Sequence, residues 1–208
     1  MPKTFTEAER IKLINKLKRT AKDLLSVYGA RKTTVDMITK KAVIPKGTFY
    51  LFYPSKEFLF WEVINEYHDD ISTVIKNSIA NTKNLDASRF AEILFQVFIS
   101  VSESFYPALM AEGEMETIIR KLPDEIVEKH QNDDADMLTE LASILPLDSS
   151  FFPDRKKAEA VSGALRILFF SLLHRREIGE TMYDNSLKIL IKGVALELFE
   201  PAYKGNET

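Results

Sequence analysis

The stretch PKGTFYLFY, residues 45–53, combines a lysine, hydroxyl groups and aromatic rings within nine positions. If the stretch is helical, one side gathers the residues that would anchor it: Pro45, Phe49, Phe52 and Tyr53. The opposite side displays Lys46, Gly47, Tyr50 and Leu51, with Thr48 at the boundary.

A displayed set of this kind suits the phosphates and the base edges of DNA in a major groove. Lys46 can meet phosphate or guanine, and the hydroxyls of Thr48 and Tyr50 can donate to phosphate. Leu51 can touch a thymine methyl group. Gly47 would let the helix approach the DNA closely, because glycine carries no side chain. The alternative is that Gly47 only fits against the first helix of the chain.

The elements that must position this stretch are predicted to be helices. A capping box formed by Thr6 and Glu9 begins a first helix that ends at Gly29. Thr33 or Thr34 caps a short second helix, and Pro45 opens a short third one. Two brief helices joined by a tight turn predict a helix-turn-helix arrangement.

The helical pattern continues through the rest of the chain. Ser55 caps a long helix to about Ala80, and further helices are expected over residues 90–105, 114–121, 123–145, 153–176 and 183–203. We therefore expect an all-α protein with a three-helix DNA-binding domain at residues 1–55. Residues 56–208 would form a second, helical-bundle domain, to which the family resemblance described below assigns ligand binding and dimerisation.

Charge is distributed unevenly along the 208 residues: residues 1–56 carry a net charge of +9, and the remainder carries −12. A basic end favours a polyanion-binding module, although a solvated lysine-rich face would give the same count. The chain contains no cysteine, and neither a signal peptide nor a membrane span is apparent. We expect a cytoplasmic protein without a membrane partner.

The residues from Ala21 to Leu59 resemble the DNA-binding domain of the TetR family of bacterial transcriptional regulators. The features that carry the resemblance are Gly29, Thr33-Thr34-Val35, Gly47-Thr48-Phe49-Tyr50 and Ser55-Lys56-Glu57. The resemblance implies that Thr34 contacts phosphate, that Lys46, Gly47 and Thr48 face the groove, and that Tyr50 and Lys56 contact flanking phosphates. Val43 stands where the family usually has glycine, and a β-branched residue is ill suited to positive φ.

The segment AVSGALRILFFSLL, residues 160–173, is apolar nearly all round its helix and should be covered on both sides. With the last helix it resembles the two-helix dimer interface of the family. The expected interface residues are Gly163, Ala164, Ile167, Ser171, Leu187, Leu190, Ile191 and Val194. The alternative is the central core helix of a monomer.

The middle helices are rich in aromatic residues and methionine, and the family resemblance implies a cavity there for an apolar or amphipathic effector. An aromatic and methionine stripe at helical spacing is more often ordinary core than a pocket. The candidate ligand residues are Phe98, Phe105, Met110, Arg166 and Phe170. The sequence shows no metal-ligand spacing, phosphate-binding glycine loop or nucleophile motif, so we expect neither an enzyme nor a cofactor.

These observations predict a homodimeric, ligand-responsive transcriptional regulator, a repressor that binds a pseudo-palindromic operator in double-stranded DNA. The alternative is a helical ligand-binding or interaction protein that has lost specific DNA recognition.

Overall fold

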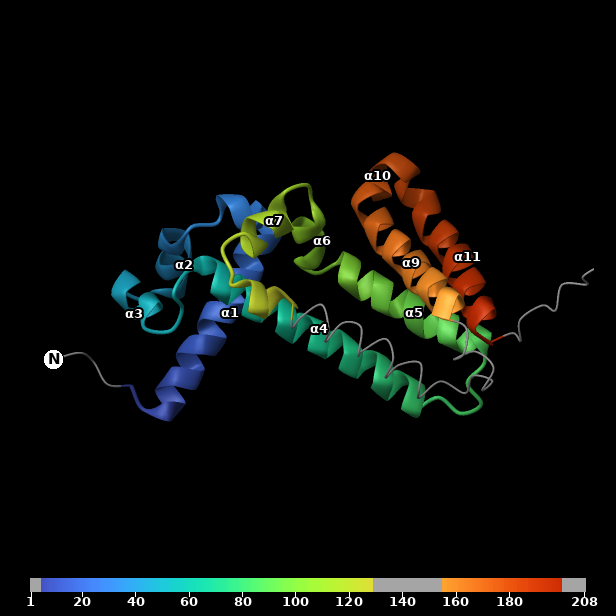
Figure 1. Cartoon of the computed structure of the whole chain (residues 1–208), viewed down its shortest axis with the longest axis horizontal. Helices are drawn as coiled ribbons and strands as arrows, with labels where there is room; N and C mark the ends of the chain where they lie inside the picture. Colours follow the sequence, from blue (N-terminus) through green and yellow to red (C-terminus); the bar gives the residue numbers. More distant parts are fainter. Residues whose placement is uncertain (1–4, 129–154, 200–208) are drawn as a thin grey trace, which may run out of the picture. The chain divides into compact units, whose positions relative to one another are not determined.

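The computed structural model describes residues 5–128 and 155–199, and every regular element in these two ranges is helical (Figure 1). The prediction of an all-α fold is confirmed. Within the described ranges, no helix has the length and apolar character needed to cross a membrane.

The first three helices form the predicted helix-turn-helix arrangement. α1 spans Glu7–Lys32 and starts at the expected capping box, in which the Thr6 hydroxyl accepts from the Glu9 amide and the Glu9 carboxylate accepts from the Thr6 amide. α2 spans Val35–Ala42 and packs against α1, and α3 spans Lys46–Tyr50 and packs against α2. The local signals of the sequence therefore placed these helices correctly.

The described chain forms two compact units, and α4, Lys56–Ala80, contributes to both. The first unit holds residues 5–69 and 104–128, so it adds α6, Tyr106–Met110, and α7, Glu114–Ile119, to the helix-turn-helix. Its core is built from fully buried side chains that include Leu17, Leu25, Ile38, Phe49 and Phe60. The functional division at residue 55 stays a prediction, while the packing extends the N-terminal unit to α6 and α7.

The second unit holds residues 70–103 and 155–199. It contains the end of α4, α5 at Ala87–Ser102, α9 at Arg155–Ser171, α10 at Arg175–Ile178 and α11 at Glu180–Phe199. α11 packs along α5 and α9. A 3₁₀ turn at Leu172–His174 interrupts the single helix expected over residues 153–176. Most of the helix expected over residues 123–145 lies outside the described residues.

Candidate nucleic-acid interface

The turn between α2 and α3 adopts the geometry that a helix-turn-helix needs, although it contains Val43. This residue has φ 51° and ψ 53°, in the left-handed region. The Val43 amide donates to the Lys40 carbonyl at 3.2 Å, and the Ile44 amide donates to the Thr39 carbonyl at 3.0 Å. These two hydrogen bonds end α2 in the arrangement that normally has a glycine at the left-handed position. The valine therefore adds backbone strain without changing the course of the chain.

Aromatic side chains anchor α3 to the interior, as the helical wheel predicts. Phe49 is fully buried and Tyr53 nearly so, with their ring centroids 5.9 Å apart. Phe52 is half-buried, and the Arg10 guanidinium lies 5.1 Å from its ring centroid. Pro45 was expected on this anchoring side, but it is exposed because it forms the N-cap of α3 rather than its first turn.

Tyr53 lies near an ion pair that joins α1 to α4. Burial raises the pKa of the Tyr53 phenol, and the nearby carboxylate of Glu62 raises it further. That carboxylate pairs with the Lys18 ammonium at 2.7 Å. The chain directly after α3 is thus held by the packing of Tyr53, which lies near this ion pair.

The opposite side of α3 is displayed to solvent. Lys46, Gly47, Tyr50 and Leu51 are exposed, and Thr48 is half-buried. A Cβ atom added at Gly47 would meet nothing within 4 Å, so the packing explanation for this glycine is wrong. The Lys46 ammonium pairs with Asp36 of α2 at 2.8 Å, and this hydrogen bond and charge raise the pKa of Lys46.

A hollow of about 380 Å³ opens beside the displayed face, between the first turns of α2 and α4. Thr34 caps α2 by accepting from the Met37 amide, and the Ser55 hydroxyl accepts from the Glu57 amide at the start of α4. Helix N-termini carry partial positive charge and free amides, which suit a phosphate group. The lining residues are Thr34, Val35, Asp36, Lys46, Tyr50, Pro54, Ser55, Lys56 and Glu57.

Lys56 lines this hollow, but its ammonium is engaged by the protein. It donates to the Ala30 carbonyl at 2.8 Å and to the Thr33 carbonyl at 2.7 Å. Burial lowers the pKa of Lys56. The side chain expected to contact a flanking phosphate is therefore used to hold the end of α1.

The five candidate ligand residues are divided between the two compact units. Phe98 is buried in the second unit, stacked on Phe169 with ring centroids 4.4 Å apart, whereas Phe105 and Met110 lie in the first unit. Arg166 and Phe170 are exposed on α9.

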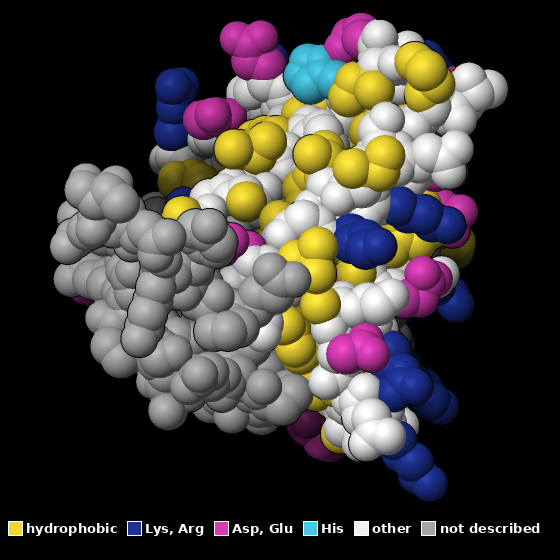
Figure 2. Space-filling view, turned by 90° about the vertical axis from the view of Figure 1, so that its right-hand side faces the viewer, with side chains coloured by type: hydrophobic (Ala, Val, Ile, Leu, Met, Phe, Trp, Pro, Cys, Tyr) yellow, Lys and Arg dark blue, Asp and Glu magenta, His cyan; other side chains and the backbone are white. Residues whose placement is uncertain are grey.

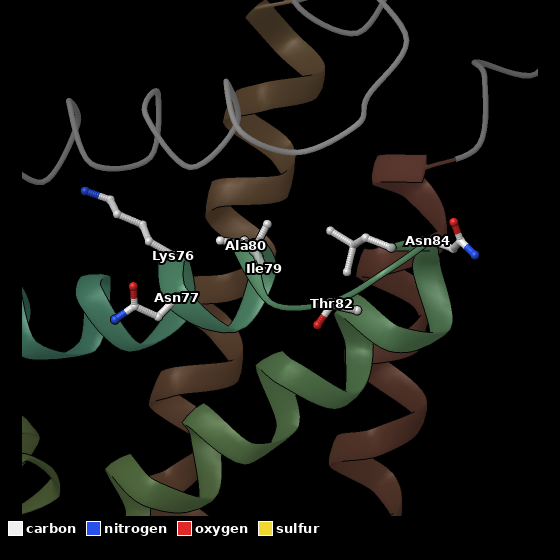
Figure 3. A pocket seen from close by; sticks show the side chains of 7 residues that line it. Lys76, Asn77, Ile79, Ala80, Thr82 and Asn84 are labelled. Atoms are coloured by element: carbon white, nitrogen blue, oxygen red, sulfur yellow. The ribbon is translucent and has the colours of Figure 1, made fainter.

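A separate pocket of about 660 Å³ lies where α4 is followed by α5, and Figure 3 shows it. Its lining residues are Lys76, Asn77, Ile79, Ala80, Thr82, Asn84 and Leu85, none of which was predicted. The polar side chains of Lys76, Asn77 and Asn84 point in different directions in this view (Figure 3). They provide no convergent set of groups for one ligand.

The expected dimer residues divide into two groups. Ile167 is 70% exposed and Leu190 54%, whereas Leu187 and Ile191 are buried within the subunit. Placing Leu187 and Ile191 at a subunit interface was wrong, because this side of α11 packs inside its own unit. Gly163, Ala164, Ser171 and Val194 are half-buried, and the Ser171 hydroxyl lies 2.7 Å from the Tyr183 hydroxyl.

An exposed apolar surface nevertheless covers parts of α9 and α11. Besides Ile167 and Leu190, it includes Phe170, Met182, Ile189 and Leu196. Cβ atoms added at Gly163 or Gly193 would meet nothing within 4 Å, so the surface is open at both glycines. Figure 2 shows hydrophobic side chains gathered in a band on the side of the molecule that it faces.

The sequence analysis did not predict two acidic residues that form contacts in and near this interface. Asp36 holds Lys46, and Glu114 of α7 accepts from the Arg31 amide at 2.9 Å. Glu114 is separated from Arg31 by 83 positions, and no periodic or capping signal links the two.

Comparisons with known proteins agree with this geometry. The family profile described as bacterial regulatory proteins, tetR family, matches residues 18–63. Over 58 residues the chain is 41% identical to the uncharacterized HTH-type transcriptional regulator YuxN of Bacillus subtilis (strain 168). That match covers 28% of this chain and only 20% of the length of the relative.

Solved structures with a similar fold include the fatty acid degradation regulator FadR from Bacillus halodurans, with a TM-score of 0.60 and 18% identity over 94% of this chain and 97% of that one. The TetR-family regulator SCO4454 from Streptomyces coelicolor has a TM-score of 0.65 and 16% identity over 91% and 97%. The likeness to these solved structures shows the fold, and the N-terminal helices have the helix-turn-helix arrangement. Residues 18–63 are similar to the DNA-binding domain of the TetR family, as the sequence resemblance implied.

Proposed function

We propose that the protein is a homodimeric transcriptional repressor that binds a pseudo-palindromic operator and is released by a small-molecule effector. The observation that carries the proposal is the displayed face of α3 beside the hollow between two helix N-termini. This arrangement offers groups for base edges and for phosphate on one surface.

On DNA, the bare backbone at Gly47 would allow α3 to enter the major groove. Lys46 would exchange its pairing with Asp36 for a phosphate or a guanine, since both offer acceptors for an ammonium. Thr34 and Tyr50, which line the hollow, would contact the flanking phosphates. Thr48 and Leu51 would complete the contact surface.

Dimerisation supports this function because a five-residue recognition helix reads few bases. Two copies would place their recognition helices about 34 Å apart, in successive major grooves. The exposed apolar surface of α9 and α11 is the proposed interface, with Gly163 and Gly193 allowing close approach of helices.

The interface proposal is tested with Ile167→Glu, and the matched control is Val74→Glu, because Val74 is an exposed apolar residue of α4. Sedimentation should show a dimer for the wild-type protein and the control, and a monomer for Ile167→Glu. A wild-type monomer, or a dimer that tolerates Ile167→Glu, would contradict the interface.

The proposed effector is an apolar or amphipathic small molecule. The second unit supports this through its buried aromatic residues Phe90, Phe95 and Phe98. The fatty acid degradation regulator with a similar fold makes fatty acids a reasonable first panel. Release would follow if binding tilted α4 and changed the spacing of the recognition helices.

DNA recognition is tested with duplexes that the wild-type protein selects from a random pool. Lys46→Ala and Tyr50→Phe should bind the selected duplex more weakly while keeping the fold, and the control Lys83→Ala changes the same charge in the second unit. If both variants bind as tightly as the wild-type protein, the interface is misassigned.

The alternative, a helical ligand-binding or interaction protein that has lost specific DNA recognition, would be favoured if Lys46→Ala and Tyr50→Phe changed binding to no duplex. The left-handed geometry of Val43 removes this valine as an argument for the alternative.

A further inference from the structure

The corner between α1 and α2 determines where the DNA-binding face begins. α1 breaks at Gly29, which has φ 71° and ψ 177°, and the chain then passes through the fully buried residues Ala30 and Thr33. Thr34, the next residue, caps α2 and lines the proposed phosphate site. A shift of this corner would therefore shift Thr34, and with it the α2–α3 pair.

Glu114 holds the corner from one side. Its carboxylate accepts from the Arg31 amide at 2.9 Å. A Cβ atom added at Gly29 would lie 2.7 Å from Glu114 Oε2 and 2.9 Å from its Cδ, so the carboxylate would have to move away. Glycine is favoured at position 29 by its positive φ, and a side chain there would displace the Glu114 carboxylate.

Lys56 holds the same corner from α4. Its ammonium bonds the Ala30 and Thr33 carbonyls, at the end of α1 where a positive charge is favourable. Burial lowers the pKa of Lys56, and the carboxylates of Glu57 and Glu114 oppose this effect. Backbone groups of Ala30, Arg31 and Thr33 are therefore bound by opposite charges from two helices.

We propose that Glu114 and Lys56 are positioning residues that act as one brace, fixing the α1–α2 corner so that Thr34 and α3 are set for DNA. The inference deepens the proposed function and rests on it. It also assigns Lys56 to the corner instead of to phosphate. Through Glu114, α7 becomes part of the apparatus that positions the DNA-binding face.

The first test measures hydrogen exchange of amides 29–37 in the free protein and needs no DNA. Glu114→Ala and Lys56→Met should each speed this exchange by about tenfold, the loss expected for a hydrogen bond to a charged group. Glu114→Gln keeps an acceptor oxygen and should restore most of the protection. The matched control is Glu116→Ala, because Glu116 is an exposed acidic residue in the first turn of the same helix.

The second test measures the salt dependence of binding to the duplex selected by the wild-type protein. Lys56→Met should weaken binding about tenfold without changing the slope of log K against log salt, because no phosphate contact is lost. Loss of a lysine that contacts phosphate should make this slope less steep by about 0.9. Lys46→Ala is the comparison variant, because Lys46 is proposed to contact DNA.

The proposal fails if Lys56→Met makes the salt slope less steep by about 0.9 while hydrogen exchange at residues 29–37 stays unchanged. It also fails if Glu114→Ala matches Glu116→Ala in exchange. If the wild-type protein selects no duplex, the proposed function fails, and the exchange experiment alone decides whether the brace exists.

Discussion

Val43 offers a quantitative prediction because its backbone is strained while its side chain contributes little packing. The residue has φ 51°, and its side chain is largely exposed, with 81% of the residue accessible. The left-handed conformation costs a non-glycine residue about 1–2 kcal/mol. The greater freedom of glycine in the unfolded chain offsets about 0.4–1 kcal/mol of that. Val43→Gly should therefore raise the free energy of unfolding by about 0.5–1 kcal/mol.

Urea unfolding followed by the fluorescence of Trp61 measures this change directly. Trp61 is the only tryptophan of the chain and is buried in the same compact unit as Val43. Val43→Ala keeps a Cβ atom in the strained conformation and should stay within about 0.5 kcal/mol of the wild-type protein.

Because glycine adopts the same φ and ψ, Val43→Gly should also bind the selected duplex as tightly as the wild-type protein. A Val43→Gly variant that unfolds more easily than the wild-type protein would refute the strain argument. Weaker DNA binding by a stable Val43→Gly variant would instead show that the valine side chain takes part in recognition.

Three further outcomes are expected. The raised pKa of Tyr53 keeps its phenol protonated where an unfolded phenol, with a pKa of 10.0, ionises. The contribution of Tyr53 to stability is thus complete below pH 10.0 and falls as the pH rises above that value. Between about pH 10 and 11, the free energy of unfolding should therefore fall less steeply for Tyr53→Phe than for the wild-type protein. Asp36→Asn frees the Lys46 ammonium and should tighten binding to random-sequence duplex about two- to fivefold at low salt, measured by fluorescence anisotropy; unchanged affinity would show that the pair does not restrain Lys46. Gly29→Ala should speed exchange at residues 29–37 as Glu114→Ala does, since its Cβ displaces the carboxylate, and normal exchange would contradict the geometry of the corner.

The N-terminal helices were predictable because their signals are local. The capping box at Thr6 and the anchoring aromatics Phe49 and Tyr53 depend on spacings of three or four residues, which a helix converts directly into contacts. Gly47 has no packing partner within 4 Å, and its role in close approach to DNA stays a prediction.

The remaining features depend on contacts that the sequence does not encode locally. Lys56 has the type and position of a phosphate ligand, but its ammonium is taken by carbonyls 23 and 26 positions away. Glu114 bonds an amide 83 positions away. Leu187 and Leu190 look alike on a helical wheel, and only the packing of α11 against α5 decides which of them is buried.

Binding to the DNA upstream of the gene for this protein, compared with scrambled DNA of equal length across a salt series, tests the central claim most directly. The account predicts tighter binding to the upstream DNA and a steep fall of affinity with salt, because phosphate contacts release counterions. Equal and weak binding to both duplexes, together with failure to select any sequence from a random pool, would contradict it.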